Sequence, residues 1–211
     1  MAWQVWLAFL GAAWVISLSP GAGAIASMSA GLNHGLRRGY WNIVGLQLGL
    51  LLQIVIVAAG VGALLASSAL AFTVIKWFGV AYLLYLGVRQ WRATPTEVTA
   101  DTDQPGGSAV ALVARGFLVN ASNPKAVVFM LAVLPQFLDP GAALVPQYAI
   151  IAATMIAVDV IVMSGYTGLA ARVLTVMRSP RQQRVTGRVF SGLFFTAAAF
   201  LSLVHRAATT V

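Results

Sequence analysis

The sequence contains no cysteine among its 211 residues. Disulfides, zinc–thiolate sites and catalysis by a thiol are therefore excluded. Histidine is scarce as well: the two histidines, His34 and His205, show no paired metal-ligand spacing, and no serine–histidine–acid cluster is evident. We therefore expect no enzyme, no bound metal and no cofactor.

Charge is the second deficit, because only 9% of the residues are charged and only five of them are acidic. A soluble domain carries about 25% charged residues. Since 60% of the residues are hydrophobic, too few polar groups remain to cover a water-facing surface. The composition predicts an integral membrane protein with several spans.

The net charge of +8 does not indicate a nucleic-acid partner. The basic residues cluster between apolar runs, as in the positive-inside pattern of membrane proteins, rather than along one face. Ten of the thirteen follow the first, third and fifth runs: Arg37, Arg38, Arg89, Arg92, Arg115, Arg172, Arg178, Arg181, Arg184 and Arg188. This bias places those connections in the cytoplasm and both termini on the outer side.

Six long apolar runs account for most of the chain. Each is near or above the ~20 residues that a bilayer core requires, and most lack the alternation of an outer-membrane barrel. They cover about 3–33, 40–66, 69–89, 109–136, 143–171 and 187–205. No Lys or Arg precedes the first run, so we expect a retained span rather than a cleaved signal. The predicted fold is all-α with six transmembrane helices.

A polar stretch divides the chain near its middle. Residues 94–108 contain Pro95, Pro105, Gly106 and Gly107, which is typical of a flexible linker. The expected units are therefore residues 1–93, a cytoplasmic linker 94–108, and residues 109–211. With three helices each, the two halves enter the membrane from opposite sides, as in inverted-topology repeats.

The first helix of each half is interrupted by proline. Half one carries SLSPGAGAI, with Pro20, Gly21 and Gly23, and half two carries NASNPKAVV, with Asn123 and Pro124. Such breaks free backbone groups that hydrocarbon cannot solvate. One break alone is as well explained by a kink, but two matched breaks favour a site between the repeats. The half-helix N-termini would face a substrate carboxylate there.

The glycines of the first break also match the dinucleotide fingerprint G-x-G-x-x-A over residues 21–26. That motif requires a preceding strand and an acid about 20 residues further on. The next acid is Glu97, and the preceding segment is an apolar span. We therefore reject a nucleotide-binding role.

Asp159 is the one acid inside an apolar run. A buried carboxylate is expensive in hydrocarbon and tends to mark a proton or substrate path. It would bind a substrate ammonium, carry a coupling proton, or alternate between the two. The structural alternatives are an ion pair with Lys125 or Arg115, or a protonated hydrogen-bonding carboxyl. For Lys125 itself, snorkelling to the interface and charge complementarity to a carboxylate stay equally open.

Polar side chains on the apolar runs complete the set of candidate residues. Gln47, Asn120 and Asn123 either join helices or hydrogen-bond a polar ligand, and we favour the ligand. Gln53 is assigned to packing, whereas Tyr166, beyond Asp159, is a candidate for the same cavity. The small-residue pair of Gly45 and Gly49 predicts a close helix contact. Glycine-rich faces also leave a homo-oligomer open.

Five stretches read SLSPGAGAI, GLQLGL, KWFGVAYLLYLG, NPKAVVF and DVIVMSGY. They resemble the LysE/RhtB family of bacterial amino-acid exporters, and most closely its homoserine, homoserine lactone and threonine exporters. The resemblance covers nearly the whole chain apart from the linker. Five residues take the positions of the family's motifs: Pro20, Gly21, Asn123, Pro124 and Lys125. Asp159 corresponds to the acid of the family's fifth span. Family members often read Pro-Gly-Pro where this chain has Ala22 in third place.

The resemblance implies efflux of a small amino acid across the bacterial inner membrane against proton entry. In such a membrane, the positive-inside bias predicts that both termini are periplasmic. The substrate carboxylate would meet the freed amides and Lys125, and its ammonium would meet Asp159. Rocking of the two repeats would then expose the site. No Gly-x-x-x-x-Gly-Lys loop is present to couple ATP, which favours a secondary mechanism. A passive channel and a structural membrane subunit are the alternatives.

Overall fold

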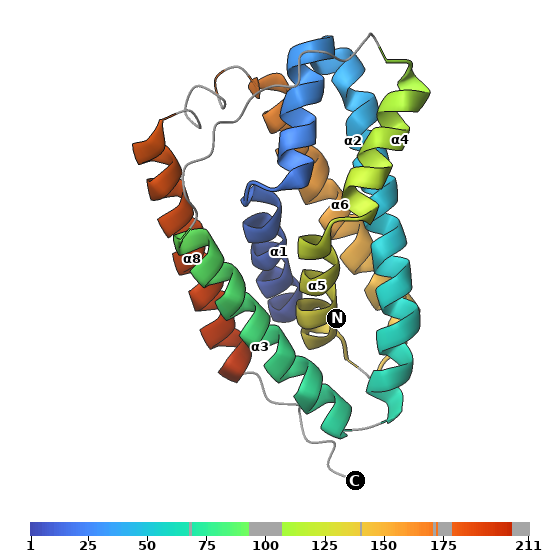
Figure 1. Cartoon of the computed structure of the whole chain (residues 1–211). Helices are drawn as coiled ribbons and strands as arrows, with labels where there is room; N and C mark the ends of the chain where they lie inside the picture. The colour runs from blue at the N-terminus through green and yellow to red at the C-terminus, as the bar shows by residue number, and fades with distance from the viewer. Residues whose placement is uncertain (68, 93–106, 140, 171, 173–178, 204–211) are drawn as a thin grey trace.

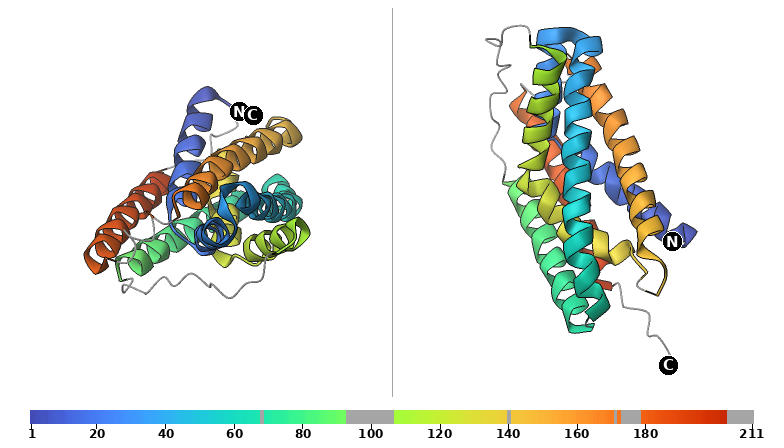
Figure 2. Two further views of the ribbon diagram at one scale, coloured as in Figure 1. Left: turned by 90° about the horizontal axis from the view of Figure 1, so that it is seen from above. Right: turned by 90° about the vertical axis from the view of Figure 1, so that its right-hand side faces the viewer.

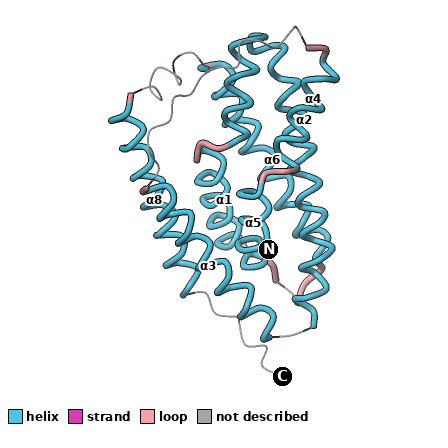
Figure 3. Tube along the Cα trace, viewed as in Figure 1, coloured by secondary structure: helices cyan, strands magenta, loops and turns pink. Residues whose placement is uncertain are grey.

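The described part of the computed structural model consists of helices and the loops between them (Figures 1 and 3). The structure describes all residues except 68, 93–106, 140, 171, 173–178 and 204–211, so most of the predicted linker lies outside the described residues. The described chain contains no strand, which confirms the all-helical prediction. The helices are α1 (Trp3–Leu18), α2 (Ala22–Ser67), α3 (Ala69–Trp91), α4 (Ala109–Ala121), α5 (Pro124–Val133), the 3-10 helix η1 (Leu134–Phe137), α6 (Leu144–Gly168) and α8 (Pro180–Leu203).

The two predicted breaks lie where expected and have the same cause. A residue that precedes proline is pushed out of the helical region into an extended conformation. Ser19, before Pro20, has φ −67° and ψ 113°, and α1 ends one residue earlier. Asn123, before Pro124, has φ −75° and ψ 102°. Proline then opens α5 at a position where no N–H is needed, and the Asn123 side chain caps that helix by accepting from the Lys125 amide at 3.1 Å.

A third change of direction lies inside α2. Gly35 has φ 70° and ψ 173°, a left-handed conformation that glycine adopts without a steric penalty. The chain rises from the first break, turns over at this glycine and descends again (Figure 1). We call residues 22–34 the short arm of α2 and residues 36–67 its long arm. The short arm thus continues α1 beyond the break, as α5 continues α4.

Length and composition support a membrane setting without establishing the number of spans. Two helices of the described chain are long and apolar enough to cross a membrane, Ala22–Gly60 and Leu144–Gly168. The pair Ala109–Ala121 and Lys125–Phe137, bent by 55°, adds a third if it forms one span. The arrangement of six spans as two repeats stays a prediction.

The last helix begins earlier than its apolar run. Hydropathy predicts a span from residue 187, but α8 already starts at Pro180. Its first two turns carry the polar sequence PRQQRVTG and extend the helix beyond the hydrophobic segment. Hydropathy therefore locates the apolar part of the helix and misses its polar first turns.

The main helix contacts run between the halves of the chain. The helix α2 packs chiefly against α4 and α6, and α3 packs against α8. Smaller contacts join α1 to α6 and α5 to α2. Seen from above, α3 and α8 lie together on one side of the bundle, away from α2 and α4 (Figure 2). Exchanging the two halves would leave this pattern of neighbours largely unchanged.

The contact between α2 and α4 depends on glycine. A Cβ on Gly45 would overlap the Val113 carbonyl oxygen, and a Cβ on Gly116 would overlap the Asn42 carbonyl oxygen. A Cβ on Gly49 would lie 2.8 Å from the Phe117 oxygen. Such small residues let helix backbones approach closely in membranes, as the pair in α2 predicted. The buried side chains around this contact belong to the core: Ile43, Leu46, Leu50, Ile54 and Leu112.

We expect Gly45→Ala to destabilise the protein, because the new methyl group would overlap the backbone of α4, which cannot move aside as a flexible side chain could. Overpacking of this kind costs about 1–3 kcal/mol. The melting temperature of the detergent-solubilised protein measures the effect. Gly11→Ala is the matched control, since nothing lies within 4 Å of its Cβ and alanine is the better helix former by about 1 kcal/mol. Equal melting temperatures for the two variants would contradict the close contact.

Candidate functional site

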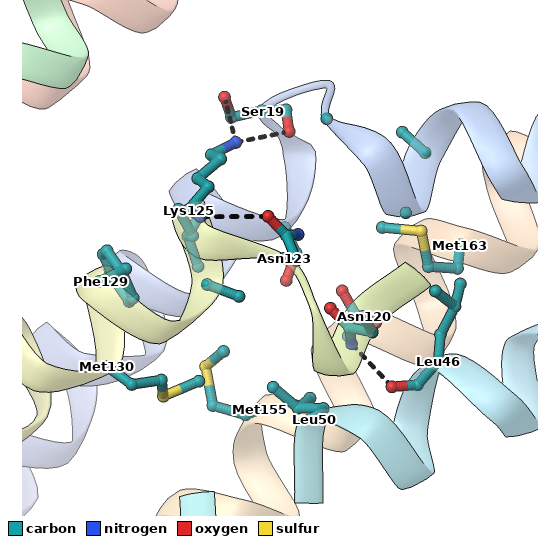
Figure 4. Close-up of a pocket in the computed structure, with 17 residues that line it drawn as sticks. Ser19, Leu46, Leu50, Asn120, Asn123, Lys125, Phe129, Met130, Met155 and Met163 are labelled. Carbon is teal, nitrogen blue, oxygen red and sulfur yellow. Dashed lines mark hydrogen bonds between the residues drawn. The ribbon is translucent and has the colours of Figure 1, made fainter. Parts of the chain in front are cut away.

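A cavity of about 60 Å³ lies where the two breaks meet (Figure 4). Residues from α1, both arms of α2, α4, α5 and α6 line it. Six of the residues proposed from sequence are among them: Gly21, Gly23, Asn120, Asn123, Lys125 and Asp159. Segments distant in sequence therefore converge on one small polar space, which we call the polar cavity.

Lys125 bridges the two breaks. Its side chain leaves α5 and reaches the loop between α1 and α2 (Figure 4). The ammonium group donates to the Ser19 carbonyl oxygen at 3.0 Å and to the Ser19 hydroxyl at 2.9 Å. Since the proline at position 20 ends helix α1, this carbonyl has no helical partner of its own. Lys125 therefore satisfies a backbone group that the break set free, rather than reaching for the membrane surface.

Asp159 presents its carboxyl group from α6 to the same cavity. Gln47, on the long arm of α2, donates from Nε2 to the Asp159 Oδ2 at 2.8 Å. The Ser17 side chain also interacts with this carboxyl group. Gln47 itself does not line the polar cavity, so it orients the carboxyl group of Asp159 from outside the lining. The cationic group of Lys125 bonds to Ser19, whereas an ion pair with Asp159 is one of the structural alternatives that the sequence leaves open.

The polar cavity brings together groups that favour negative charge and an acid that favours positive charge. Residues at the start of α2 and of α5 both line it, namely Gly21, Gly23 and Ala24, and Asn123, Lys125 and Ala126. Helix N-termini carry partial positive charge and amide donors that suit a carboxylate. Asp159 on α6 lines the same cavity and supplies the opposite sign when it is ionised. The arrangement therefore suits a zwitterion that carries both an ammonium and a carboxylate group.

Besides Gln47, three of the proposed residues lie outside the cavity lining. Tyr166 donates its hydroxyl to the Leu18 carbonyl oxygen at 2.8 Å, so it caps the end of α1 instead of lining the polar cavity. Pro20 and Pro124 do not line it either, and they contribute by ending α1 and opening α5.

The second break is satisfied from the other half of the chain. Gln53, on the long arm of α2, donates from Nε2 to the Asn120 carbonyl oxygen at 2.5 Å. Asn120 in turn donates from Nδ2 to the Leu46 carbonyl oxygen at 2.7 Å (Figure 4). The assignment of Gln53 to packing alone is therefore incomplete, because this side chain supports the second break as Tyr166 supports the first one.

Sequence reasoning missed several lining residues. Ser17 and Ser19 lie within the first break motif, and their hydroxyls beside the proline were a usable signal. Phe129, Met155 and Met163 also line the cavity, but nothing in the sequence separates them from other apolar side chains. Among the described residues, no group of three or more His, Cys, Asp or Glu side chains is placed to hold a metal ion.

The family model for the LysE type translocator matches residues 14–205. The chain belongs to this family. The match covers both breaks and every residue proposed for the site, and it confirms the resemblance seen in the motifs. The polar cavity therefore lies within the part of the chain that matches the family model.

Curated relatives cover the translocator almost from end to end. It is 44% identical over 199 residues to an uncharacterized membrane protein of Vibrio cholerae, across 94% of this chain and 97% of the relative. It is 40% identical over 210 residues to the homoserine/homoserine lactone efflux protein of Salmonella typhimurium, across 98% and 100%. A leucine efflux protein of Klebsiella pneumoniae is 27% identical over 199 residues, across 92% of each chain. No solved structure matches the translocator.

Tyr166→Phe is expected to lower the stability of the translocator, because the Leu18 carbonyl oxygen loses the donor that the structure shows. A typical hydrogen bond contributes about 0.5–1.5 kcal/mol. Thermal unfolding in detergent provides the measurement. Tyr85→Phe is the matched control, since Tyr85 is 54% exposed on α3. If both variants melted at the same temperature, the hydrogen bond from Tyr166 to the first break would make no contribution to stability.

Proposed function

We propose that this translocator is a secondary active exporter of small amino acids, such as homoserine, homoserine lactone or threonine, across the bacterial inner membrane. Proton antiport drives the export. The observation that carries the proposal is the polar cavity, which is lined by Asp159, Lys125 and the first residues of two helices. The efflux functions named for its relatives support the direction of transport and the substrate class.

The substrate binds in one orientation. Its ammonium group pairs with the Asp159 carboxylate, and its carboxylate meets the first amides of α2 and α5 together with Lys125. A lactone has no carboxylate but keeps the ammonium group and a carbonyl oxygen that accepts hydrogen bonds. Asp159 therefore recognises the group that amino acids and their lactones share.

Competition at one carboxylate explains the coupling. Asp159 is the one acid in the apolar segments, and such acids mark ion and proton pathways. A substrate ammonium arriving from the cytoplasm displaces the proton from this carboxyl group. After the substrate leaves on the outer side, a proton takes its place and returns inward. One acid thereby exchanges a proton for each substrate cation.

The topology that we propose consists of two inverted three-helix repeats, with both termini in the periplasm and the linker in the cytoplasm. The pattern of helix neighbours supports it, since exchanging the halves largely preserves that pattern. Gln47 and Asp159 lie on the second helix of their respective repeats and bond to one another. Tyr166 and Gln53 supply corresponding caps at the two breaks.

A passive channel or a structural subunit would need no substrate-specific pairing of charges. Counterflow in proteoliposomes without an ion gradient distinguishes these roles. An exporter exchanges labelled homoserine against unlabelled homoserine with saturable kinetics, and a channel or a structural subunit does not.

Asp159→Asn is expected to abolish proton-driven accumulation of homoserine, because the amide keeps the bond from Gln47 but neither binds a proton nor attracts an ammonium. The measurement is uptake into inverted proteoliposomes under an imposed pH gradient. Asp139→Asn is the matched control, since Asp139 is an exposed loop residue. Accumulation by Asp159→Asn at the wild-type rate would disprove the coupling role.

Lys125→Met should raise the KM for homoserine by about ten- to a hundredfold, because a hydrogen bond to a charged group contributes about 1.5–3 kcal/mol. The KM for homoserine lactone, which lacks the carboxylate, should rise much less. Counterflow kinetics with both substrates test this difference. Equal increases for the two substrates would show that Lys125 acts through the structure of the break and not through the carboxylate.

A further inference from the structure

A second and larger cavity lies next to the polar one. Its volume is about 570 Å³, and it lies between α1, α3, α5 and α8. That volume falls within the range of about 300–1,000 Å³ that is typical of small-molecule sites. The lining is apolar except for Gln4, Gln136 and Thr196. We call this space the apolar cavity.

The two cavities share a wall. Phe129 lines both of them, and this side chain is 4% exposed. Phe194, which is 1% exposed, lines the apolar cavity, and its ring centroid lies 5.9 Å from the Lys125 ammonium group. In Figure 4 Phe129 lies along α5 beyond Lys125. One layer of aromatic side chains thus separates the charged groups from the apolar space.

Each cavity has a property that the other lacks. The polar cavity, at about 60 Å³, holds the charged groups but has room for only a few water molecules. It accommodates the head group of an amino acid and little more. The apolar cavity has room for a substrate, but its described lining carries no charged side chain.

We propose that the two cavities are compartments of one substrate site, and that the apolar cavity receives the aliphatic side chain of the exported amino acid. This inference rests on the proposed export function and extends it to amino acids with longer, unbranched side chains. Rotation of the Phe129 ring joins the compartments while the head group stays between Asp159 and the helix N-termini. A lipid tail is the rival occupant of the apolar cavity.

A homologous series of competitors tests the proposal. Proteoliposomes carrying the whole chain perform homoserine counterflow in the presence of 2-aminobutyrate, norvaline, norleucine or 2-aminooctanoate. We expect the inhibitory concentration to fall about three- to fourfold for each added methylene group, since each is buried on binding. The D-enantiomers partition into lipid equally well, so they control for effects on the bilayer. A flat series would overturn the proposal in favour of a lipid tail.

A cavity-filling variant tests the location. Ala197 lines the apolar cavity. Ala197→Phe should therefore reduce the advantage of 2-aminooctanoate, which is the ratio of the inhibitory concentration of 2-aminobutyrate to its own, by at least about tenfold. This is the effect expected when several methylene groups are no longer buried. Ala199→Phe adds the same side chain to the exposed face of α8 and should preserve the advantage. If both variants kept the full advantage, the aliphatic chain would lie elsewhere and the proposal would be overturned.

The two levels of the proposal fail in different ways. If the wild-type protein shows no counterflow of any amino acid, the export function is wrong and the inference falls with it. If homoserine counterflow is saturable but independent of the competitor's chain length, export stands and the apolar compartment alone is refuted.

Discussion

Backbone groups freed inside an apolar bundle must find partners within the protein, and the rest of this structure depends on that constraint. Hydrocarbon offers no hydrogen bonds, so each proline break needs polar side chains nearby. Half two supplies Lys125 to Ser19 and Tyr166 to Leu18, while half one supplies Gln53 to the Asn120 carbonyl. The freed groups at each break are therefore bonded by side chains from the other half of the chain, and these bonds hold the two halves together.

The same requirement brings the functional groups together. A lysine that reaches a freed carbonyl is also a cation beside two helix N-termini, and a glutamine that joins two helices also orients the buried acid. Under the proposed binding mode, a substrate carboxylate at Lys125 would compete with the Ser19 carbonyl oxygen for the same ammonium protons. Substrate binding and local backbone structure would then be linked through one side chain. A residue of this kind changes both properties when it is replaced.

The features that sequence predicts best are those determined by local rules. The breaks were predictable because proline constrains the residue before it, and the convergence of Asp159 and Lys125 followed from the matched breaks and the family motifs. The hydrogen bonds of Lys125 with Ser19 and of Gln47 with Asp159 could not be predicted, because they depend on how helices from different halves align. Gln47 and Gln53 look alike in sequence, yet one orients an acid and the other caps a break. The apolar cavity left no signal, since its lining has the same composition as a lipid-facing surface.

The glycine contact between α2 and α4 has a mechanical consequence. It joins the long arm of α2, from half one, to α4, from half two, at the distance of backbone contact. Separating the halves as intact bodies, as in the predicted rocking motion, would break this backbone contact. The bends at Ser19 and Asn123 are the weaker points, because no helical ladder runs through them. The close contact between α2 and α4 therefore favours bending at the two breaks over separation of these two helices.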